Sequence, residues 1–300
     1  ALAQELGMDV IVTDHHVPPN PLPPALSIVD PKVEGSTYPF SELSGGGLAF
    51  KLVQAIYHRA GRDWSRDLLE LVALSTVADL VPLVDENRYL VKEGLKELRC
   101  SKRPGLQAMY RQAGIRPDSI DTETISFYIA PRLNAAGRLD HAHLSYRLLT
   151  TRSDDEAKEL ASRLERLNVE RQQLTEAACA RARDTVTAHT PIPAVLLVGG
   201  DWVQPGIAGL VASRLVDEFS RPTIVTSLKN GVIRGSARGI PGYDLLTDAL
   251  TPCGDLFVRF GGHKQAAGFE MTPDHLSALE QRMGLVAEKA AAMIQPQAVL

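Results

Sequence analysis

The stretch Met8-Asp9-Val10-Ile11-Val12-Thr13-Asp14-His15-His16 combines an apolar run with three chemically active side chains. Gly7 precedes the run and the proline-rich segment Pro18–Pro21 follows it, a pattern that predicts a short buried strand ending in a loop. Open α/β sheets place their sites at the C-terminal ends of strands, so these three side chains are candidates for metal binding or proton transfer. The alternative interpretation is a turn or a helix N-cap, where Asp-His pairs also occur.

Length and composition indicate a globular protein of about two domains, since the chain has 300 residues. A composition of 44% hydrophobic and 23% charged residues provides for ordinary cores. No apolar run approaches the ~20 residues that span a bilayer, and the chain does not open with a signal segment. The three cysteines form no Cys-x-x-Cys pair, which argues against a disulfide framework and favours a reducing, cytoplasmic setting. The net charge of −4 means that any nucleic-acid partner needs a local basic surface.

Two apolar helices are predicted next to polar groups. Ser44-Gly45-Gly46-Gly47 opens the first, Leu48–Arg59, and its free N–H groups suit a phosphate, although close backbone packing fits the glycines equally well. The second, Leu68–Leu80, is apolar on most sides and carries Asp79 near its end. A carboxylate in such surroundings is costly unless it is paired or binds a metal, so we predict a site role for Asp79, with capping as the alternative.

Two arginines flank small residues in Arg132-Leu133-Asn134-Ala135-Ala136-Gly137-Arg138. Arginine forks suit phosphate or carboxylate, and small residues between them would let a ligand come close. They could equally be structural arginines tied to a carboxylate such as Asp140, and this choice stays open. Shorter helices are predicted before this segment, at Asn87–Arg99, Arg103–Ala113 and Ile125–Ile129.

A long helix is predicted after the capping-box pattern Ser153-Asp154-Asp155-Glu156, because neither Gly nor Pro occurs from Ala157 to His189. A helix of ~30 residues would be ~45 Å long, which suggests a connector between domains. Its alternating Arg and Glu residues predict a solvated, ion-paired face, with a stripe facing nucleic acid as the alternative.

A second α/β pattern follows Pro191 and Pro193. Gly261-Gly262-His263 is predicted as a flexible turn, either an anion-binding nest of backbone amides or a plain glycine turn. The predicted strands are Ala194–Val198, Thr223–Thr226 and Val232–Ala237, and the predicted helices are Gly206–Phe219, Tyr243–Leu250 and Pro273–Ala287.

Taken in order, six motifs closely resemble the RecJ family of single-strand-specific 5′ exonucleases in the DHH phosphoesterase superfamily. Arg132-Leu133-Asn134-Ala135-Ala136-Gly137-Arg138-Leu139 discriminates best, because smaller relatives share the DHH and Gly-Gly-His motifs without it. The others are Asp14-His15-His16, Val77-Ala78-Asp79-Leu80-Val81-Pro82-Leu83, Val211-Ala212-Ser213-Arg214-Leu215, Gly235-Ser236-Ala237-Arg238 and Gly261-Gly262-His263 with Ala266-Ala267-Gly268.

The resemblance implies a Mn²⁺- or Mg²⁺-dependent hydrolase that cuts single-stranded DNA from the 5′ end in DNA repair and recombination. The expected fold is α/β: a parallel-sheet DHH domain with helices on both faces, a connecting helix, and a smaller DHH-associated domain closing over the cleft. The expected bounds are 1–150 for the partial DHH domain, 151–189 for the connector, 190–295 for the second domain and 296–300 for a linker. Other repair or replication proteins are further candidate partners, and no membrane is expected.

The resemblance also assigns roles to residues. His15 and Asp79 would be metal ligands, His16 would contact a second metal or the scissile phosphate, and Asp14 would orient the pair. Two metals ~3.5–4 Å apart activate water and neutralise oxyanions in phosphodiester cleavage. Phosphate contacts position a strand without reading its bases, and the residues expected to make them are Arg132, Arg138, Ser236, Arg238, Gly261, Gly262 and His263.

Some family features are missing from this sequence. The Asp-rich motifs that supply further metal ligands would precede Ala1, so we expect a partial metal site and no activity from these 300 residues alone. The His often found beside Trp202 in the family is absent, and the tail Ile294–Gln297 is interpreted as a linker to a further domain.

Two competing functions are compatible with parts of the pattern. The first is a DHH phosphodiesterase acting on short oligonucleotides or cyclic dinucleotides, against which the arginine motif and the long connector argue. The second is a non-catalytic relative that binds nucleic acid or a replication partner. The chemically active residues that the sequence retains argue against that second function: Asp14, His15, His16, Asp79 and His263.

Overall fold

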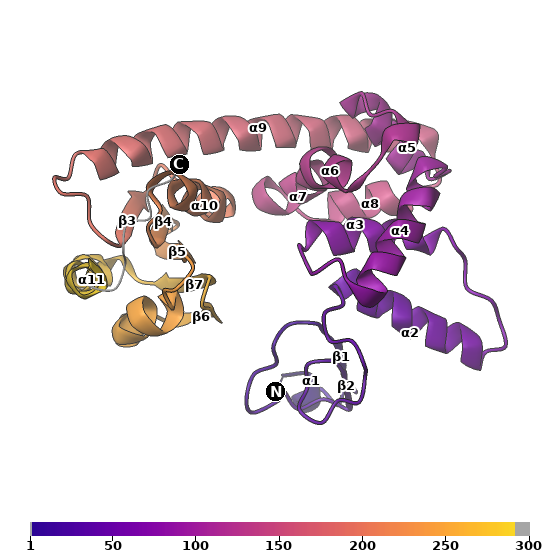
Figure 1. Ribbon diagram of the computed structural model, residues 1–300, viewed down its shortest axis with the longest axis horizontal. Helices are drawn as coiled ribbons and strands as arrows, with labels where there is room; N and C mark the ends of the chain where they lie inside the picture. Colours follow the sequence, from indigo (N-terminus) through magenta and orange to yellow (C-terminus); the bar gives the residue numbers. More distant parts are fainter. Residues whose placement is uncertain (1, 292–300) are drawn as a thin grey trace. The chain divides into compact units, whose positions relative to one another are not determined.

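The computed structural model describes residues 2–291 and divides them into two compact units (Figure 1). The first unit comprises residues 1–136 and 142–165, and the second comprises residues 137–141 and 166–300. The predicted linker at 296–300 and the tail Ile294–Gln297 lie outside the described residues.

The first unit contains a two-stranded parallel sheet. After the short helix α1 (Leu2–Glu5), strand β1 (Ile11–Thr13) pairs with β2 (Ser27–Val29), Ile11 opposite Ser27 and Thr13 opposite Val29. The strand predicted at the start of the chain is therefore present. The prediction that it is buried is wrong for the described residues, since Ile11 is 61% exposed. Within them β1 pairs with β2 alone, and its other edge carries no strand.

Helices form most of the first unit. Helix α3 is predominantly apolar, and its Leu69 and Val72 pack with Leu43, Phe50 and Leu90 in one core. Leu80, just beyond α3, has φ of +59° and turns the chain sharply after Asp79. The helices are α2 (Gly45–Arg59), α3 (Leu68–Ala78), α4 (Asp85–Arg99), α5 (Pro104–Ala113), α6 (Thr122–Thr124), a π-helical turn (Ile125–Ile129), α7 (Ala130–Leu139) and α8 (His143–Thr150).

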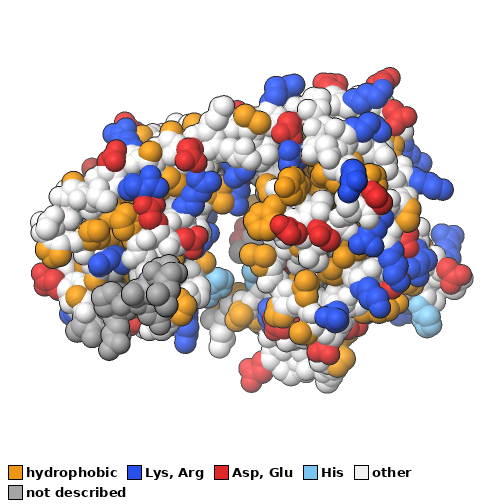
Figure 2. All heavy atoms as spheres, turned by 45° about the horizontal axis from the view of Figure 1, so that its top comes forward, with side chains coloured by type: hydrophobic (Ala, Val, Ile, Leu, Met, Phe, Trp, Pro, Cys, Tyr) orange, Lys and Arg blue, Asp and Glu red, His pale blue; other side chains and the backbone are white. Residues whose placement is uncertain are grey.

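The predicted long helix is present as α9 (Asp154–Thr187), an unbroken run of 34 residues. At 1.5 Å per residue it is ~51 Å long. Part of its charge is ion-paired within each unit, as Glu165 with Arg132 and Arg183 with Glu218. Figure 2 shows basic and acidic side chains interspersed over the visible surface, consistent with the net charge of −4.

The second unit is built on a five-stranded sheet in the order β3-β4-β5-β7-β6. Strands β3 and β4 are parallel, and the remaining pairs are antiparallel. Strand alternation directs Val225 into a core with α10 and Ile224 into a core with α11, so both faces of the sheet are covered. The elements are β3 (Leu196–Gly200), α10 (Ala208–Phe219), β4 (Thr223–Lys229), β5 (Val232–Arg238), β6 (Arg259–His263), β7 (Ala266–Met271) and α11 (Leu276–Ala291).

The predicted helix Tyr243–Leu250 is present as a π-helical segment, Leu245–Leu250, which is followed by a 3-10 segment, Thr251–Leu256. One local prediction in this unit is wrong. Gly261-Gly262-His263 is neither a nest nor a turn but the second half of β6, with Gly261 opposite Gly268 on β7. Glycine is required at 262 because its φ is +143° and a Cβ would lie 2.5 Å from the Cα of Ala267.

Helices long and apolar enough to cross a membrane do not occur among residues 2–291.

Candidate metal and phosphate sites

The Asp14-His15-His16 segment directly follows β1 and is organised by one carboxylate oxygen. Asp14 Oδ1 accepts hydrogen bonds from the backbone N–H groups of His15 at 2.7 Å and His16 at 3.2 Å. The same oxygen lies 2.7 Å from His16 Nδ1. The hydrogen bond with the His16 side chain, helped by the two backbone bonds, holds the pKa of Asp14 below its usual value. Asp14 thus forms a turn and at the same time keeps an ionised carboxylate beside both histidines.

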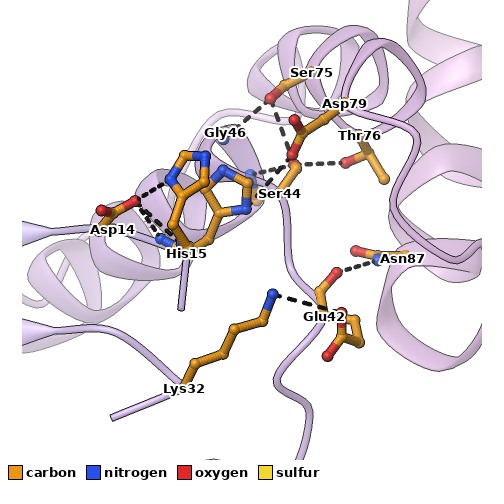
Figure 3. A network of polar contacts seen from close by, with 12 residues as sticks. Asp14, His15, Lys32, Glu42, Ser44, Gly46, Ser75, Thr76, Asp79 and Asn87 are labelled. Atoms are coloured by element: carbon orange, nitrogen blue, oxygen red, sulfur yellow. Dashed lines mark hydrogen bonds and ion pairs between the residues drawn. The ribbon is translucent and has the colours of Figure 1, made fainter. Parts of the chain in front are cut away.

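His15 brings this segment to the end of α3. Its Nδ1 lies 3.5 Å from Asp79 Oδ2, and its side chain is only 14% exposed, whereas that of His16 is 73% exposed. Ligand atoms of Asp14, His15 and His16 all lie within 4.8 Å of one another. Figure 3 shows His15 between Asp14 and Asp79. The fold therefore brings together four side chains that the sequence predicted for one site, all in the first unit.

The glycine-rich start of α2 supports His15 by close packing. Gly46 N–H donates to Ser75 Oγ at 3.1 Å, and a Cβ at Gly46 would lie 2.5 Å from the Cβ of Ser75. A Cβ at Gly45 would lie 3.4 Å from His15 Cδ2. Ser44 caps the helix, since its Oγ accepts a hydrogen bond from Gly47 N–H at 3.1 Å. The packing interpretation of these glycines thus holds at Gly46, whose N–H already has a partner.

A cavity of about 560 Å³ opens beside His15 and Asp79. Leu71 and Leu74 of α3 form part of an apolar wall, and Asn134 of α7 contributes an amide. This volume suits a nucleotide-sized ligand, since ligand pockets typically span ~300–1,000 Å³. The sequence showed Asn134 between two arginines, but only the helical face shared by Ala130, Leu133 and Asn134 identifies it as a lining residue.

The guanidinium of Arg132 is hydrogen-bonded to protein groups in this fold. Its Nε and Nη2 donate to the two carboxylate oxygens of Glu165 at 2.5 and 3.2 Å, and its Nη1 donates to the carbonyl of Tyr128 at 2.7 Å. The carboxylate partner is Glu165 of α9, not Asp140. A phosphate would have to displace these bonds to reach the guanidinium.

Arg138 and Arg238 form no ion pair within residues 2–291. Arg138 Nη1 donates to the carbonyl of Gly206 at 3.1 Å, and Arg238 Nη1 donates to the carbonyl of Ala237 at 2.8 Å and contacts Ser236 Oγ at 3.4 Å. Burial lowers the pKa of both guanidinium groups, and the charge of Arg238 lowers that of Arg138 further. Two unpaired, half-buried cations that repel each other are well placed for an anion.

Glycines at the start of α10 make room for this pair. A Cβ at Gly209 would lie 2.9 Å from Arg238 Nη2, and one at Gly206 would overlap the carbonyl oxygen of Arg138. Arg171 of α9 adds a third cation, because burial and then the charge of Arg138 lower its pKa, and its buried Nε has no hydrogen-bond partner. Gly206, Gly209 and Arg171 were not among the residues predicted for the site. The only sequence signal for the glycines is their spacing around a helix start.

His263 lies exposed at the end of the edge strand β6. It belongs to the second unit with Arg138, Ser236 and Arg238, whereas His15, Asp79 and Arg132 belong to the first. The predicted residues therefore form a metal-competent cluster in one unit and an arginine cluster in the other.

Comparison with known proteins assigns the class. The family described as DHH family, N-terminal domain matches residues 1–76, and the DHHA1 domain matches residues 192–289. The crystal structure of RecJ with Mn²⁺ from Thermus thermophilus superposes with a TM-score of 0.85 at 34% identity, covering 97% of this chain and 42% of that one. The crystal structure of an exonuclease RecJ bound to manganese gives 0.79 at 35% identity, covering 98% of this chain and 72% of that one.

These matches define a DHH protein with a DHHA1 domain. More narrowly, the chain belongs to the RecJ family. The predicted combination of a parallel DHH sheet, a long helix and a second α/β domain is thereby confirmed.

Curated relatives carry the same family name. The single-stranded-DNA-specific exonuclease RecJ of Bacillus subtilis is 40% identical over 289 residues, which cover 96% of this chain and 36% of the relative. The protein of that name in Escherichia coli is 35% identical over 314 residues, covering 94% of this chain and 52% of the relative. The chain thus spans between a third and about half of these relatives.

Proposed function

We propose that this chain is part of an exonuclease that removes nucleotides from the 5′ end of single-stranded DNA, in DNA repair and recombination. In this proposal it provides the metal-binding histidines and a phosphate-binding cluster, called the phosphate grip, that consists of Arg138, Ser236 and Arg238. The observation that carries the proposal is the approach of His15 to Asp79 within a cluster that also contains Asp14 and His16. The relatives are single-stranded-DNA-specific exonucleases, which supports the choice of single-stranded DNA over short oligonucleotides and over a non-catalytic role.

The donor set fits the divalent metals bound in the related structures. Imidazole nitrogen and carboxylate oxygen suit Mn²⁺ and, for the oxygens, Mg²⁺. His15 and Asp79 would hold one ion, and His16, whose ring is mostly exposed, would hold a second ion or face the scissile phosphate. Bound metal ions supply an activated water and neutralise the developing oxyanion.

The chain's own groups have distinct tasks in this proposal. Asp14 fixes the backbone of both histidines and orients the His16 ring. Asn134 presents an amide to the nucleotide in the cavity beside Asp79. Arg132 acts through Glu165, by holding α7 against α9, and so positions Asn134.

The phosphate grip is assigned to the second unit. Arg138, Ser236 and Arg238 bind the terminal 5′ phosphate, because they combine two unpaired guanidinium groups with a hydroxyl. His263 and the exposed backbone of Gly261 and Gly262, on the edge strand β6, contact the DNA nucleotides that follow the terminal phosphate. These contacts involve phosphates, so the bases of the strand are not read.

His15→Ala tests the metal site. We expect Mn²⁺ affinity, measured by isothermal titration calorimetry, to fall by about 10–100-fold or more. In a protein that also carries the Asp-rich motifs, the same substitution should abolish cleavage of a long 5′-phosphorylated single strand, whereas affinity for the strand should change little. His58→Ala is the matched control, because His58 lies exposed in the last turn of α2.

Two outcomes contradict the proposal. Unchanged Mn²⁺ affinity in His15→Ala would remove His15 from the metal site and favour a non-catalytic role. In the protein that carries the Asp-rich motifs, faster cleavage of a 5′-phosphorylated dinucleotide than of the long strand would favour the short-oligonucleotide phosphodiesterase.

A further inference from the structure

A second cavity lies in the second unit, between α9, the 3-10 turn Pro205–Ile207 and the tip of the β4–β5 hairpin. It measures about 440 Å³. Its polar lining comes from Arg138, Glu170, Gln204, Lys229, Asn230 and Arg234. Lys229, Asn230 and Arg234 belong to none of the motifs that define the family resemblance, so this cavity is not explained by the proposed 5′ grip.

The cavity carries excess positive charge. Arg138, Lys229 and Arg234 face a single lining carboxylate, that of Glu170. Lys229 Nζ contacts Gln204 Oε1 at 3.3 Å and forms no ion pair within residues 2–291. Arg234 shares Glu270 with Arg259, at 3.1 and 2.9 Å, so two guanidinium groups compete for one carboxylate. In a chain with a net charge of −4, such a surplus favours an anionic ligand.

The cavity adjoins the arginine pair through Arg138. Side chains alternate along a strand, so Val232, Arg234, Ser236 and Arg238 lie on one face of β5. The odd-numbered neighbours Ile233 and Ala237 are buried in the core on the opposite face. Arg234 and Arg238 are four residues apart, or ~13 Å along the strand. Arg138 lines the cavity and interacts electrostatically with Arg238, so one row of basic groups runs from the cavity to the proposed 5′ phosphate grip.

The lining also suits the rest of a nucleotide. Leu139, Leu174 and Val232 form an aliphatic wall for a base or a sugar, and the amides of Gln204 and Asn230 can donate and accept hydrogen bonds. Asn230 and Gly231 have φ of +53° and +72°, the conformation of a tight two-residue hairpin turn, which fixes the tip of the hairpin. The volume lies within the ~300–1,000 Å³ of small-molecule sites.

We propose that this cavity binds a phosphorylated nucleoside as a second nucleotide site, with Lys229 and Arg234 on the phosphate and the aliphatic wall on the base or sugar. The choice of a nucleotide over another phosphate ester rests on the proposed function. The ligand is either a free 5′-mononucleotide or a nucleotide of the bound strand, and these two sources share the same chemistry.

The test combines Lys229→Gln and Arg234→Gln in an Arg238→Gln background, in which the proposed 5′ phosphate grip has lost one of its two guanidinium groups. The matched control in that background is Arg259→Gln, which breaks an ion pair with the same Glu270 but lies outside the cavity. Thymidine 5′-monophosphate, thymidine, inorganic phosphate and a 5′-phosphorylated single strand are titrated by calorimetry. Circular dichroism melting shows that each variant is folded.

We expect the double substitution to weaken thymidine 5′-monophosphate binding by about tenfold or more, equivalent to ~1.4 kcal/mol, and Arg259→Gln to leave it unchanged. A parallel loss of strand affinity identifies the strand as the ligand source, and a loss confined to the mononucleotide identifies the free nucleotide. Three results would overturn the proposal. The affinity for thymidine 5′-monophosphate could fall equally in the double variant and in the control, it could fall in neither, or thymidine could bind as tightly as its phosphate. A different result would contradict the proposed exonuclease function. In that case Arg238→Gln and the unsubstituted chain would bind the 5′-phosphorylated single strand with the same affinity.

Discussion

At the scale of single residues, Glu70 is a buried carboxylate in the first unit. Glu70 lies on the apolar helix α3, and its side chain is 2% exposed. Its carboxylate pairs with Arg103, which also donates to Asp67 Oδ2 at 3.0 Å and to the carbonyl of Leu149 at 3.3 Å. Burial nevertheless outweighs these bonds and raises the pKa of Glu70 above its ordinary value of 4.5. Ser101 and Arg103 thus offset only part of the cost of burying this carboxylate.

Arg103→Met should lower the free energy of unfolding by ~3–5 kcal/mol, because it leaves the buried carboxylate unpaired. The loss should be larger at pH 7 than at pH 5. A folded-state pKa above 4.5 means that the protonated carboxyl stabilises the fold, and this stabilisation disappears as pH rises through that pKa. Removing Arg103 moves the pKa still higher, and the unpaired carboxylate is charged to a larger extent at pH 7 than at pH 5.

Urea unfolding at the two pH values measures this difference. Arg66→Met is the control, because Arg66 is 57% exposed and pairs with Glu93 and Glu97 at the surface, where ion pairs contribute little. A loss in Arg103→Met that is independent of pH, or no greater than that in Arg66→Met, would contradict the assigned role of Arg103.

At the scale of secondary-structure elements, the packing of α2 on α3 sets the position of both His15 and Asp79. Gly46→Ala would place a Cβ 2.5 Å from the Cβ of Ser75 and force the helices apart. We expect a loss of ~1–3 kcal/mol, typical of overpacking, together with weaker Mn²⁺ binding, since Gly45 contacts His15 and Asp79 ends α3.

Gly284→Ala is the matched control for this helix glycine. Gly284 lies in α11, and a Cβ there would meet nothing within 4 Å. It should therefore stabilise the chain by ~0.5–1 kcal/mol through the helix preference of alanine. Thermal melts and Mn²⁺ titrations compare the two variants. Equal metal affinity in Gly46→Ala and the unsubstituted chain would show that α2 does not position the ligands.

At the scale of the whole molecule, the two compact units each contain one of the two tryptophans. Trp64 packs edge-on against Phe50 in the core of the first unit, with ring centroids 4.9 Å apart. Trp202 lies against Arg181 in the second, with Arg181 Cζ 4.9 Å from the ring centroid. Each indole therefore reports the unfolding of its own unit when the other is replaced by Phe.

Val211→Ala should separate the two transitions. Val211 is fully buried in the core between α9, α10 and the sheet, and losing two of its methyl groups costs ~2 kcal/mol. We expect the Trp202 fluorescence transition in urea to move to lower denaturant, and the Trp64 transition to move much less, because the units have separate cores. Equal shifts of both transitions would show that the units unfold as one.

Local patterns were sufficient for much of this fold. Helix α9 follows from a capping box and 34 residues of uninterrupted helical sequence, and β1 follows from a short apolar run bounded by turn residues. The Asp14-His15-His16 segment is similarly local, since Asp14 bonds to its two immediate neighbours. Asp79 is different, because it lies just beyond α3 and its side chain is 38% exposed, so burial does not require a partner for it and only the fold brings it to His15.

The chemistry of the arginines and glycines was decided by the tertiary structure. Arg132 and Arg138 are alike in the sequence, yet Arg132 meets Glu165, which is 33 residues away, while Arg138 meets a carbonyl 68 residues away and no carboxylate among the described residues. Gly261 and Gly262 are extended because β7 pairs with them. By itself the sequence determined where helices, strands and metal-competent side chains occur, because these depend on neighbouring residues. Which charges remain free for a ligand depends on distant partners, and only the packed chain brings those partners together.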